Sequence, residues 1–154
     1  MKQNSTAKEQ SLNPQPAVSI EARPTVSADQ LDERLLSALN AAAEKKALDV
    51  VVLDLREIAS FTDFFVITTG ANERQVQAIS DGVYETLKKS GSTAARVEGY
   101  KTAEWVLLDY GDFVLHVFEQ KARQFYDLER LWRESKRVDL PPEIVGSSSL
   151  RRDS

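Results

Sequence analysis

Apolar residues recur at helical spacing in residues 27–46, SADQLDERLLSALNAAAEKK. The positions that share one face of such a helix are Leu31, Leu35, Leu39 and Ala42. Ser27 can accept a hydrogen bond from the first turn, and Gln30, three residues later, can reach back, which is the reciprocal pairing of a capping box. The pattern therefore predicts an amphipathic helix that is capped at Ser27.

A second helical period occupies residues 73–91, ERQVQAISDGVYETLKKSG. Its apolar stripe consists of Val76, Ile79, Val83 and Leu87. Asn72 is a favoured N-cap residue with Gln75 three positions on, and Gly91 can end the helix after two lysines in its last turn. The segment predicts a helix that is entered from a strand ending at Gly70.

Short runs rich in β-branched and aromatic residues predict the strands. They are residues 49–56, 63–70, 95–100, 105–109 and 113–118. The first two runs are apolar without alternation, as strands buried on both faces are. The last two are joined by a tight Tyr-Gly connection and predict a hairpin.

The periodic residues of 121–135 predict a final helix, whose apolar face holds Ala122, Phe125, Leu128 and either Leu131 or Trp132. Pro141 and Pro142 end any continuation. The order helix, two strands, helix, three strands, helix predicts an α/β fold with a mixed β-sheet flanked by helices. The order of the strands within the sheet does not follow from the pattern.

A chain of 154 residues has room for one domain with a sizeable core. Residues 1–26 are rich in Pro, Ser, Gln and Asn and show no period, which predicts a disordered N-terminal extension. Residues 27–137 are expected to form the single domain. Residues 138–154, with the run GSSSLRRDS, are expected to form a flexible tail.

The composition excludes several classes of site. The chain has 0 cysteines, which rules out disulfides, thiolate metal sites and thiol nucleophiles. No apolar run approaches the roughly 20 residues that cross a bilayer, and the polar N-terminus lacks the core of a signal peptide. We therefore expect a cytoplasmic protein without a membrane partner.

Charge is distributed unevenly along the chain. Residues 28–132 hold 12 Lys and Arg against 18 Asp and Glu, whereas the whole chain has a net charge of only −4. An acidic body argues against direct, sequence-specific binding of nucleic acid, because phosphate contacts need clustered basic residues. It favours a basic protein as the partner.

The one histidine, His116, is the only candidate base for a nucleophile. It alternates with Leu115 and Val117 along a predicted strand, which is typical of a histidine packed on one face of a sheet and hydrogen-bonded locally. Because it has no histidine or cysteine companion, a zinc site is disfavoured. We expect no catalytic residue, no metal and no cofactor.

Two further features resemble ligand sites but have a structural explanation. Asp109 and Asp112 are separated by a two-residue turn, whereas paired carboxylates that hold a metal usually project from one face of a strand. Asp residues beside a glycine also serve tight turns through local hydrogen bonds. Gly70 followed by Asn72 could bind a phosphate at a helix start, but a single glycine is a weak signal and helix entry explains both residues.

The stretch EGYKTAEWVLLDYGD, residues 98–112, interleaves acidic and aromatic side chains. By strand alternation one face carries Trp105, Leu107 and Asp109, and the other carries Val106, Leu108 and Tyr110. If the first face is exposed, it has the aromatic anchor and the charge of a protein interface. Alternatively, Trp105 belongs to the core, and the periodicity does not decide between the two.

Several blocks of the sequence together resemble the ribosomal silencing factor, or Iojap-like, family. These blocks are FTDFFVITTG, RQVQAISDGV, VEGY, EWVLLDYGDFVLHVF and RQFYDLERLW, which follow one another between about Ala28 and Arg133. One departure is NERQV, where members commonly have SSRHV, so that Gln75 replaces a histidine.

This resemblance implies a nucleotidyltransferase-like topology without nucleotidyl transfer activity. It also implies binding to the large ribosomal subunit through its fourteenth ribosomal protein, a basic protein on the intersubunit face. Such binding blocks joining of the small subunit and represses translation under nutrient limitation. By position, the partner-binding residues are Trp105, Asp109 and Asp112, with Glu98, Leu107 and Tyr110 as weaker candidates. Some members form homodimers when free.

Two other functions stay open at this point. One is a nucleotide-binding or nucleotidyl-transfer enzyme on the same fold, although the chain has no clustered Asp-x-Asp and no phosphate-binding Gly-Ser pair. The other is an α/β adaptor with a different basic partner.

Overall fold

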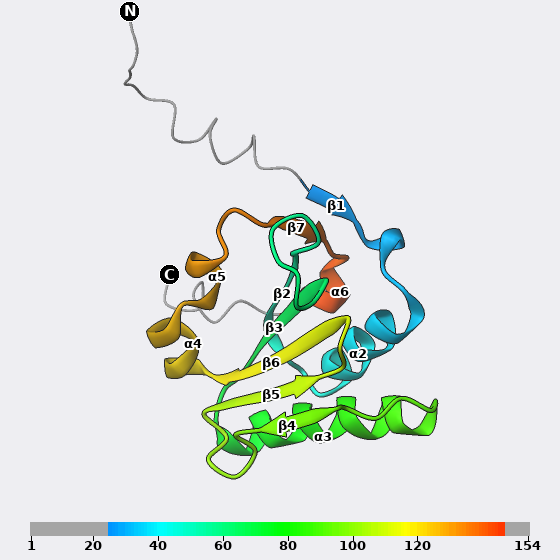
Figure 1. Cartoon of the computed structure of the whole chain (residues 1–154). Helices are drawn as coiled ribbons and strands as arrows, with labels where there is room; N and C mark the ends of the chain where they lie inside the picture. Colours follow the sequence, from blue (N-terminus) through cyan, green and yellow to red (C-terminus); the bar gives the residue numbers. More distant parts are fainter. Residues whose placement is uncertain (1–24, 147–154) are drawn as a thin grey trace, which may run out of the picture.

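The computed structural model describes residues 25–146, and a seven-stranded sheet runs through them (Figure 1). The strands are β1 (Thr25–Ser27), β2 (Leu48–Asp54), β3 (Phe64–Gly70), β4 (Arg96–Glu98), β5 (Trp105–Asp109), β6 (Phe113–Glu119) and β7 (Lys136–Asp139). The helices are the 3-10 turn η1 (Ala28–Gln30), α2 (Glu33–Glu44), α3 (Glu73–Lys89), α4 (Gln120–Tyr126), α5 (Leu128–Leu131) and α6 (Pro142–Val145).

The strands lie in the order β1-β7-β2-β3-β6-β5-β4. The pairs β1/β7 and β3/β6 are parallel, and the remaining neighbours are antiparallel. The sheet is therefore mixed, and with its flanking helices it confirms the predicted α/β fold. This order is compatible with the nucleotidyltransferase-like topology that the resemblance implied.

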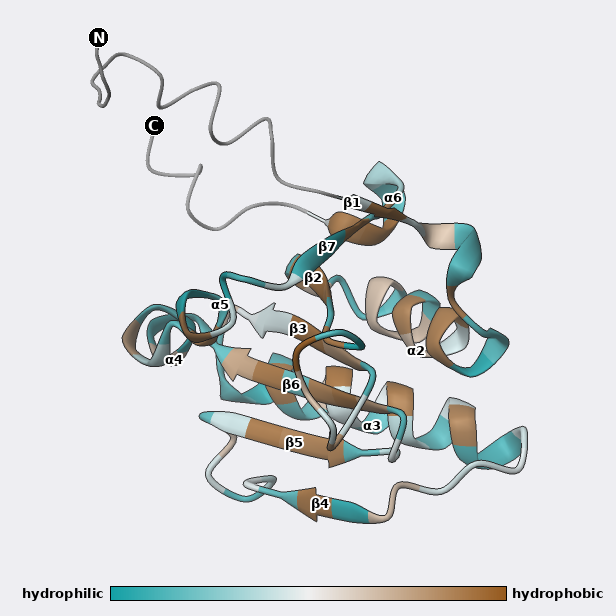
Figure 2. Ribbon diagram, turned by 45° about the horizontal axis from the view of Figure 1, so that its top comes forward, coloured by the Kyte–Doolittle hydropathy of each residue, from teal (hydrophilic) through white to brown (hydrophobic). Residues whose placement is uncertain are grey.

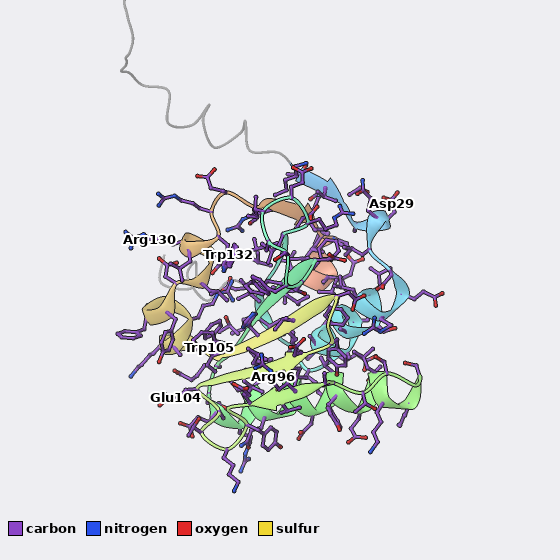
Figure 3. All side chains as sticks on the ribbon, in the orientation of Figure 1. Asp29, Arg96, Glu104, Trp105, Arg130 and Trp132 are labelled. Atoms are coloured by element: carbon purple, nitrogen blue, oxygen red, sulfur yellow. The ribbon has the colours of Figure 1, made fainter. Side chains whose placement is uncertain are left out.

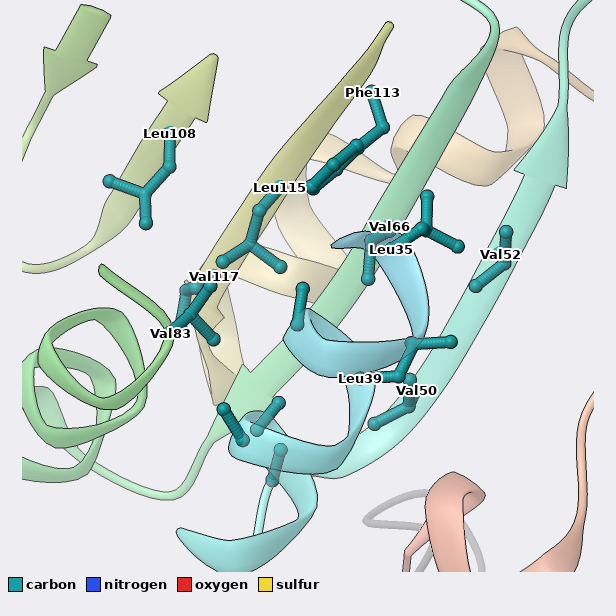
Figure 4. Close-up of a cluster of buried hydrophobic side chains, with 14 of the residues drawn as sticks. Leu35, Leu39, Val50, Val52, Val66, Val83, Leu108, Phe113, Leu115 and Val117 are labelled. Carbon is teal, nitrogen blue, oxygen red and sulfur yellow. The ribbon is translucent and has the colours of Figure 1, made fainter. Parts of the chain in front are cut away.

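One face of the sheet is covered by α2, α3 and α6. Their apolar stripes meet alternate residues of the central strands, among them Val52, Val66, Leu115 and Val117 (Figure 4). Figure 2 shows β3, β5 and β6 as largely hydrophobic ribbons, whereas α2 and α3 alternate between hydrophobic and hydrophilic turns. This helical face holds the larger of the two hydrophobic clusters in residues 25–146.

The opposite face of the sheet packs against α4 and α5. The side chains buried there include Leu53, Phe65, Ile67, Phe118 and Leu128. Because α4 and α5 are short and lie at one end of the sheet (Figure 1), they leave part of this face uncovered.

The two predicted helix starts had different outcomes. At α3 the prediction is confirmed: Asn72 Oδ1 accepts a hydrogen bond from the Gln75 amide at 2.9 Å, and Gln75 Oε1 accepts one from the Ala71 amide at 2.7 Å. At the first helix it is wrong, because Ser27 caps only the η1 turn and α2 is capped by Asp32. The carboxylate of Asp32 accepts from the Leu35 amide, and Asp is as good an N-cap as Ser.

The predicted final helix over 121–135 is also wrong. The chain leaves the helical conformation at Asp127, whose φ of 47° is left-handed, so that α4 and α5 are separate short helices. After α5 the chain forms strand β7. Apolar periodicity did not reveal this break, since residues on either side of it still face the same cluster.

The fold also extends beyond the predicted domain boundaries. Val138 in β7 and Ile144 in α6 are buried, so the described part of the predicted tail belongs to the core. At the other end, Val26 is buried in β1 and pairs with Val138. Residues 1–24 and 147–154, which complete the predicted extension and tail, lie outside the described residues.

Candidate partner-binding site

The two faces of β5 have different environments. Val106 and Leu108 are 0% and 1% exposed and pack into the helical cluster. Trp105 and Leu107 lie on the opposite face, where they are only partly buried against the cluster beneath α4 and α5. The alternation predicted for this strand is thus observed, and the face that carries Trp105 is the one left partly open.

An aromatic layer spans this open side of the sheet. Its members come from β3, β5, β6, the loop before β3 and the region of α4 and α5, and we call them the aromatic face: Phe61, Phe65, Trp105, Phe118, Phe125, Tyr126 and Trp132. The Trp105 ring lies 4.8 Å from both the Phe118 and the Tyr126 ring centroids. Figure 3 places Trp105 and Trp132 toward α4 and α5 on this side. The rings are close enough to support one another through edge and stacking contacts.

Several side chains of this region are strongly exposed. Phe61 is 59% exposed, Phe125 80% and Tyr126 44%, and Leu131 of α5 is 75% exposed. Apolar side chains gathered at one place on a surface are typical of an interaction site. The aromatic face is therefore the candidate site of this protein.

His116 lies beneath the aromatic face. It is 3% exposed, and its Nδ1 accepts a hydrogen bond from Trp105 Nε1 at 3.0 Å. Burial lowers the pKa of His116 to about 3, because the charged imidazolium would lose its hydration. The prediction of a buried, locally bonded histidine is confirmed.

The shifted pKa of His116 makes the stability of the protein depend on pH. The fold favours the neutral imidazole, so unfolding takes up a proton once the pH drops below 6.5, the ordinary pKa of a histidine. The free energy of unfolding therefore decreases as the pH falls from 6.5 to about 3. Between pH 7.5 and 5, His116 alone is expected to lower the free energy of unfolding by about 2 kcal/mol. Urea unfolding of wild type and His116→Asn at both pH values measures this contribution. Equal losses in the two proteins would contradict it.

The carboxylates of the predicted site are engaged within the fold. Asp109 Oδ1 accepts from the Gly111 amide at 2.9 Å, which is the turn chemistry expected from sequence, and Asp109 Oδ2 lies 3.6 Å from Arg96. Glu98 is exposed on β4, 3.3 Å from the same arginine. Both carboxylates remain partly accessible, so the structure leaves them open to a partner.

Asp112 has a different environment from Trp105. Its two carboxylate oxygens accept hydrogen bonds from Arg34 Nη1 at 2.9 and 3.0 Å, and Arg34 Nη2 donates to the Tyr110 carbonyl at 3.2 Å. Since Arg34 belongs to α2, Asp112 is directed toward the helical face, at the opposite end of the hairpin from Trp105. The structure therefore does not bring Asp112 together with Trp105, although the resemblance implied that both bind the partner.

Tyr110 lies on the Val106 side of β5, as the alternation predicted, and not beside Trp105. Its side chain is 7% exposed and stacks on Phe113 with ring centroids 5.0 Å apart. Burial raises the pKa of its phenol to about 12. Tyr110 is therefore a core residue of the helical face, whereas Leu107 does lie on the open side as expected.

Sequence reasoning missed residues that border the aromatic face. Glu104, immediately before Trp105, is exposed and forms no ion pair within the described range (Figure 3). Phe125 was assigned to the buried stripe of a continuous helix, yet it is exposed because that helix ends at Tyr126. The clustering of aromatic residues in RQFYDLERLW was the available signal.

The entry to α3, the candidate phosphate site, is used for helix capping as predicted. A Cβ on Gly70 would lie 2.8 Å from the Val76 amide nitrogen, so glycine is needed for the close approach of strand and helix. The adjoining hollow of about 580 Å³ is lined by Ala71, Asn72, Glu73, Arg74 and Glu119. A phosphate there would meet two carboxylates, and the Ala71 and Gln75 amides already have acceptors.

The described part of the chain holds neither a cluster of metal ligands nor a membrane-spanning helix. Among residues 25–146, no group of three His, Cys, Asp or Glu side chains is arranged to hold a metal ion. Within the same range, no helix has the length and apolar character needed to span a membrane.

Fold and site together define an α/β domain with an exposed aromatic face. The family model "Ribosomal silencing factor during starvation" matches residues 28–153. A relative of that name, ribosomal silencing factor RsfS from Halalkalibacterium halodurans, is 44% identical over 108 residues, covering 70% of this chain and 92% of the relative. The protein therefore belongs to the ribosomal silencing factor family.

Further relatives and one solved structure are similar to this chain. Ribosomal silencing factor RsfS of Bacillus subtilis is 36% identical over 71% of this chain and 95% of its own length. The chloroplastic protein Iojap of Zea mays is 38% identical, but the match spans only 53% of that protein. A crystal structure from Bacillus halodurans, 44% identical, covers 70% of this chain and 98% of its own with a TM-score of 0.64. The two bacterial relatives are named as silencing factors, not as enzymes.

Proposed function

We propose that this protein binds the large ribosomal subunit through its fourteenth ribosomal protein and blocks joining of the small subunit. Membership of the silencing factor family supports the ribosome as the target. The observation that carries the proposal is the partly exposed Trp105 within the aromatic face, whose members Phe61, Phe125 and Tyr126 are exposed. A large aromatic surface with few charges at its centre suits a protein partner.

Three carboxylates on β4, on β5 and just before β5 support a basic partner. Glu104 adjoins Trp105 in the chain and has a free carboxylate within the described residues, and Glu98 and Asp109 are reachable on the neighbouring strands. We assign the partner contacts to Trp105, Leu107 and these three carboxylates. Asp112 supports the hairpin through Arg34 instead of contacting the partner. Because exposed charges are screened by salt, the affinity should decrease with ionic strength.

The proposed mechanism is steric and takes place in the cytoplasm, where the subunits join. A domain seated on the intersubunit side only has to occupy space that the small subunit requires, so no turnover is involved. In the absence of the ribosome, the same aromatic face would be available for a homodimer. A nucleotide-binding function is less well supported, since the entry to α3 is capped and flanked by Glu73 and Glu119.

Sedimentation of purified subunits tests the proposal. Adding the protein to separated subunits before they are mixed should increase the fraction of free subunits and place the protein in the large-subunit peak. The isolated fourteenth ribosomal protein should bind it directly. The affinity should decrease between about 50 and about 300 mM salt, because the Debye length shortens from about 14 to about 6 Å over this range. Unchanged subunit joining would refute the proposed function, and joining blocked without binding of the isolated ribosomal protein would refute the named partner.

A further inference from the structure

The orientation of Trp105 depends on one polar contact. The indole has a single hydrogen-bond donor, and this Nε1–H points inward to His116 Nδ1 at 3.0 Å. The ring itself is held between Phe118 and Tyr126, each 4.8 Å away. With its polar atom bonded inside, the indole presents only apolar ring surface to the outside.

His116 is held rigidly enough to define this orientation. It lies in the middle of β6, between β3 and β5, and its ring is 4.5 Å from Phe65 and 6.3 Å from Phe118. Because Nδ1 accepts the indole proton, the neutral imidazole must carry its own proton on Nε2. Burial keeps the imidazole neutral, so the acceptor persists at physiological pH.

A histidine at this position is costly for folding. Its Nε2 is buried and has no hydrogen-bond partner among residues 25–146. An N–H buried without an acceptor costs stability, and an aliphatic side chain of similar size would avoid that cost at Nε2 but leave the Trp105 Nε1–H without its acceptor. The bond to Trp105 is therefore what the histidine provides in exchange for its unpaired Nε2, and such local conflicts are expected at functional sites.

We propose that His116 is a positioning residue for the partner-binding surface, and that its Nδ1 holds the Trp105 indole in the orientation the partner requires. His116 is buried and does not itself contact the partner. This inference rests on the proposed function, because it assigns His116 a role in the same surface.

Two substitutions at position 116 separate positioning from packing. His116→Leu removes the acceptor and keeps an apolar core, whereas His116→Asn keeps an acceptor close to the position of Nδ1. Three properties of each protein are measured: the affinity for isolated large subunits, the melting temperature, and the ¹H–¹⁵N resonance of the Trp105 indole, identified with Trp105→Phe.

The leucine variant is expected to bind at least 10-fold more weakly, with an unchanged or higher melting temperature and a shifted, faster-exchanging indole resonance. The asparagine variant is expected to bind within about threefold of wild type, since the change costs less than one kcal/mol at the interface. A merely structural role for His116 would instead lower the melting temperature of the leucine variant and leave its affinity near wild type.

The outcomes distinguish this inference from the proposed function. If wild type binds the large subunit and His116→Leu binds equally well, the positioning role is refuted and the proposed function stands. If both variants are folded and equally weak, the acceptor at Nδ1 is not what matters, and the inference is again refuted. If wild type does not bind at all, the proposed function fails and the inference fails with it.

Discussion

Trp105→Ala is expected to weaken binding to the large ribosomal subunit by about 100-fold, which corresponds to about 3 kcal/mol. The indole contacts Phe118 and Tyr126 in the aromatic face and is only partly buried, so truncation removes the central apolar surface offered to a partner. The bond to His116 is also lost, which leaves a second buried imidazole nitrogen without a partner. Co-sedimentation with large subunits over a range of protein concentrations measures the effect.

Tyr100→Ala is the matched control for this experiment. Tyr100 is also an exposed aromatic residue, 38% accessible, but it borders α3 through its hydrogen bond to Asp81 and lies outside the aromatic face. The affinity of the Tyr100→Ala variant for the large subunit should stay within about twofold of wild type, because a surface substitution changes the free energy by only a few tenths of a kcal/mol. Equal weakening by the two substitutions, with both proteins folded, would show that the aromatic face is not the docking surface.

Gly99→Ala is expected to destabilise the fold by about 3 kcal/mol or more. Gly99 has a φ of 80°, and a Cβ there would lie within van der Waals overlap of the Trp105 carbonyl oxygen. The loop between β4 and β5 folds back tightly at this point, with the Ala103 amide donating to the Gly99 carbonyl at 2.9 Å. An added methyl group therefore has to displace the start of β5, which carries Trp105.

Gly111→Ala provides the control for backbone conformation. Gly111 has a similar φ of 90°, but a Cβ there would have no atom within 4 Å. Only the left-handed conformation is penalised, at about 1–2 kcal/mol. Urea unfolding of the two variants isolates the cost of the clash, and equal losses would mean that the loop before Trp105 can relax without breaking contacts.

The local features of this fold were predictable because they depend on a few neighbouring residues. Asn72 and Gln75 cap α3 through bonds that span three or four positions. The β5–β6 hairpin follows from alternation and from a glycine in its turn, where Asp109 bonds the Gly111 amide two residues away. The same alternation placed Trp105 and Leu107 on one face and Val106 and Leu108 on the other.

Features that depend on distant contacts were mispredicted. Apolar spacing in 121–135 is compatible with one helix, but the left-handed Asp127 divides it and turns Phe125 outward. Asp112 was expected to serve the turn or, by the resemblance, the partner, and its pairing with Arg34, 78 positions earlier in the chain, was not foreseen. The last strand was missed because β7 is stabilised by pairing with β1 and β2 and carries no strong pattern of its own.

The sequence by itself determined the α/β class, the hairpin and the family, since these follow from short periods and from collinear motifs. Only the tertiary structure decided which face of the hairpin is open. Three helices cover the Val106 side of the sheet and two short ones cover the end of the Trp105 side, and no local pattern encodes how many elements pack against a given face. For the same reason the bond between Trp105 and His116, which joins two strands through their side chains, became visible only in the folded protein.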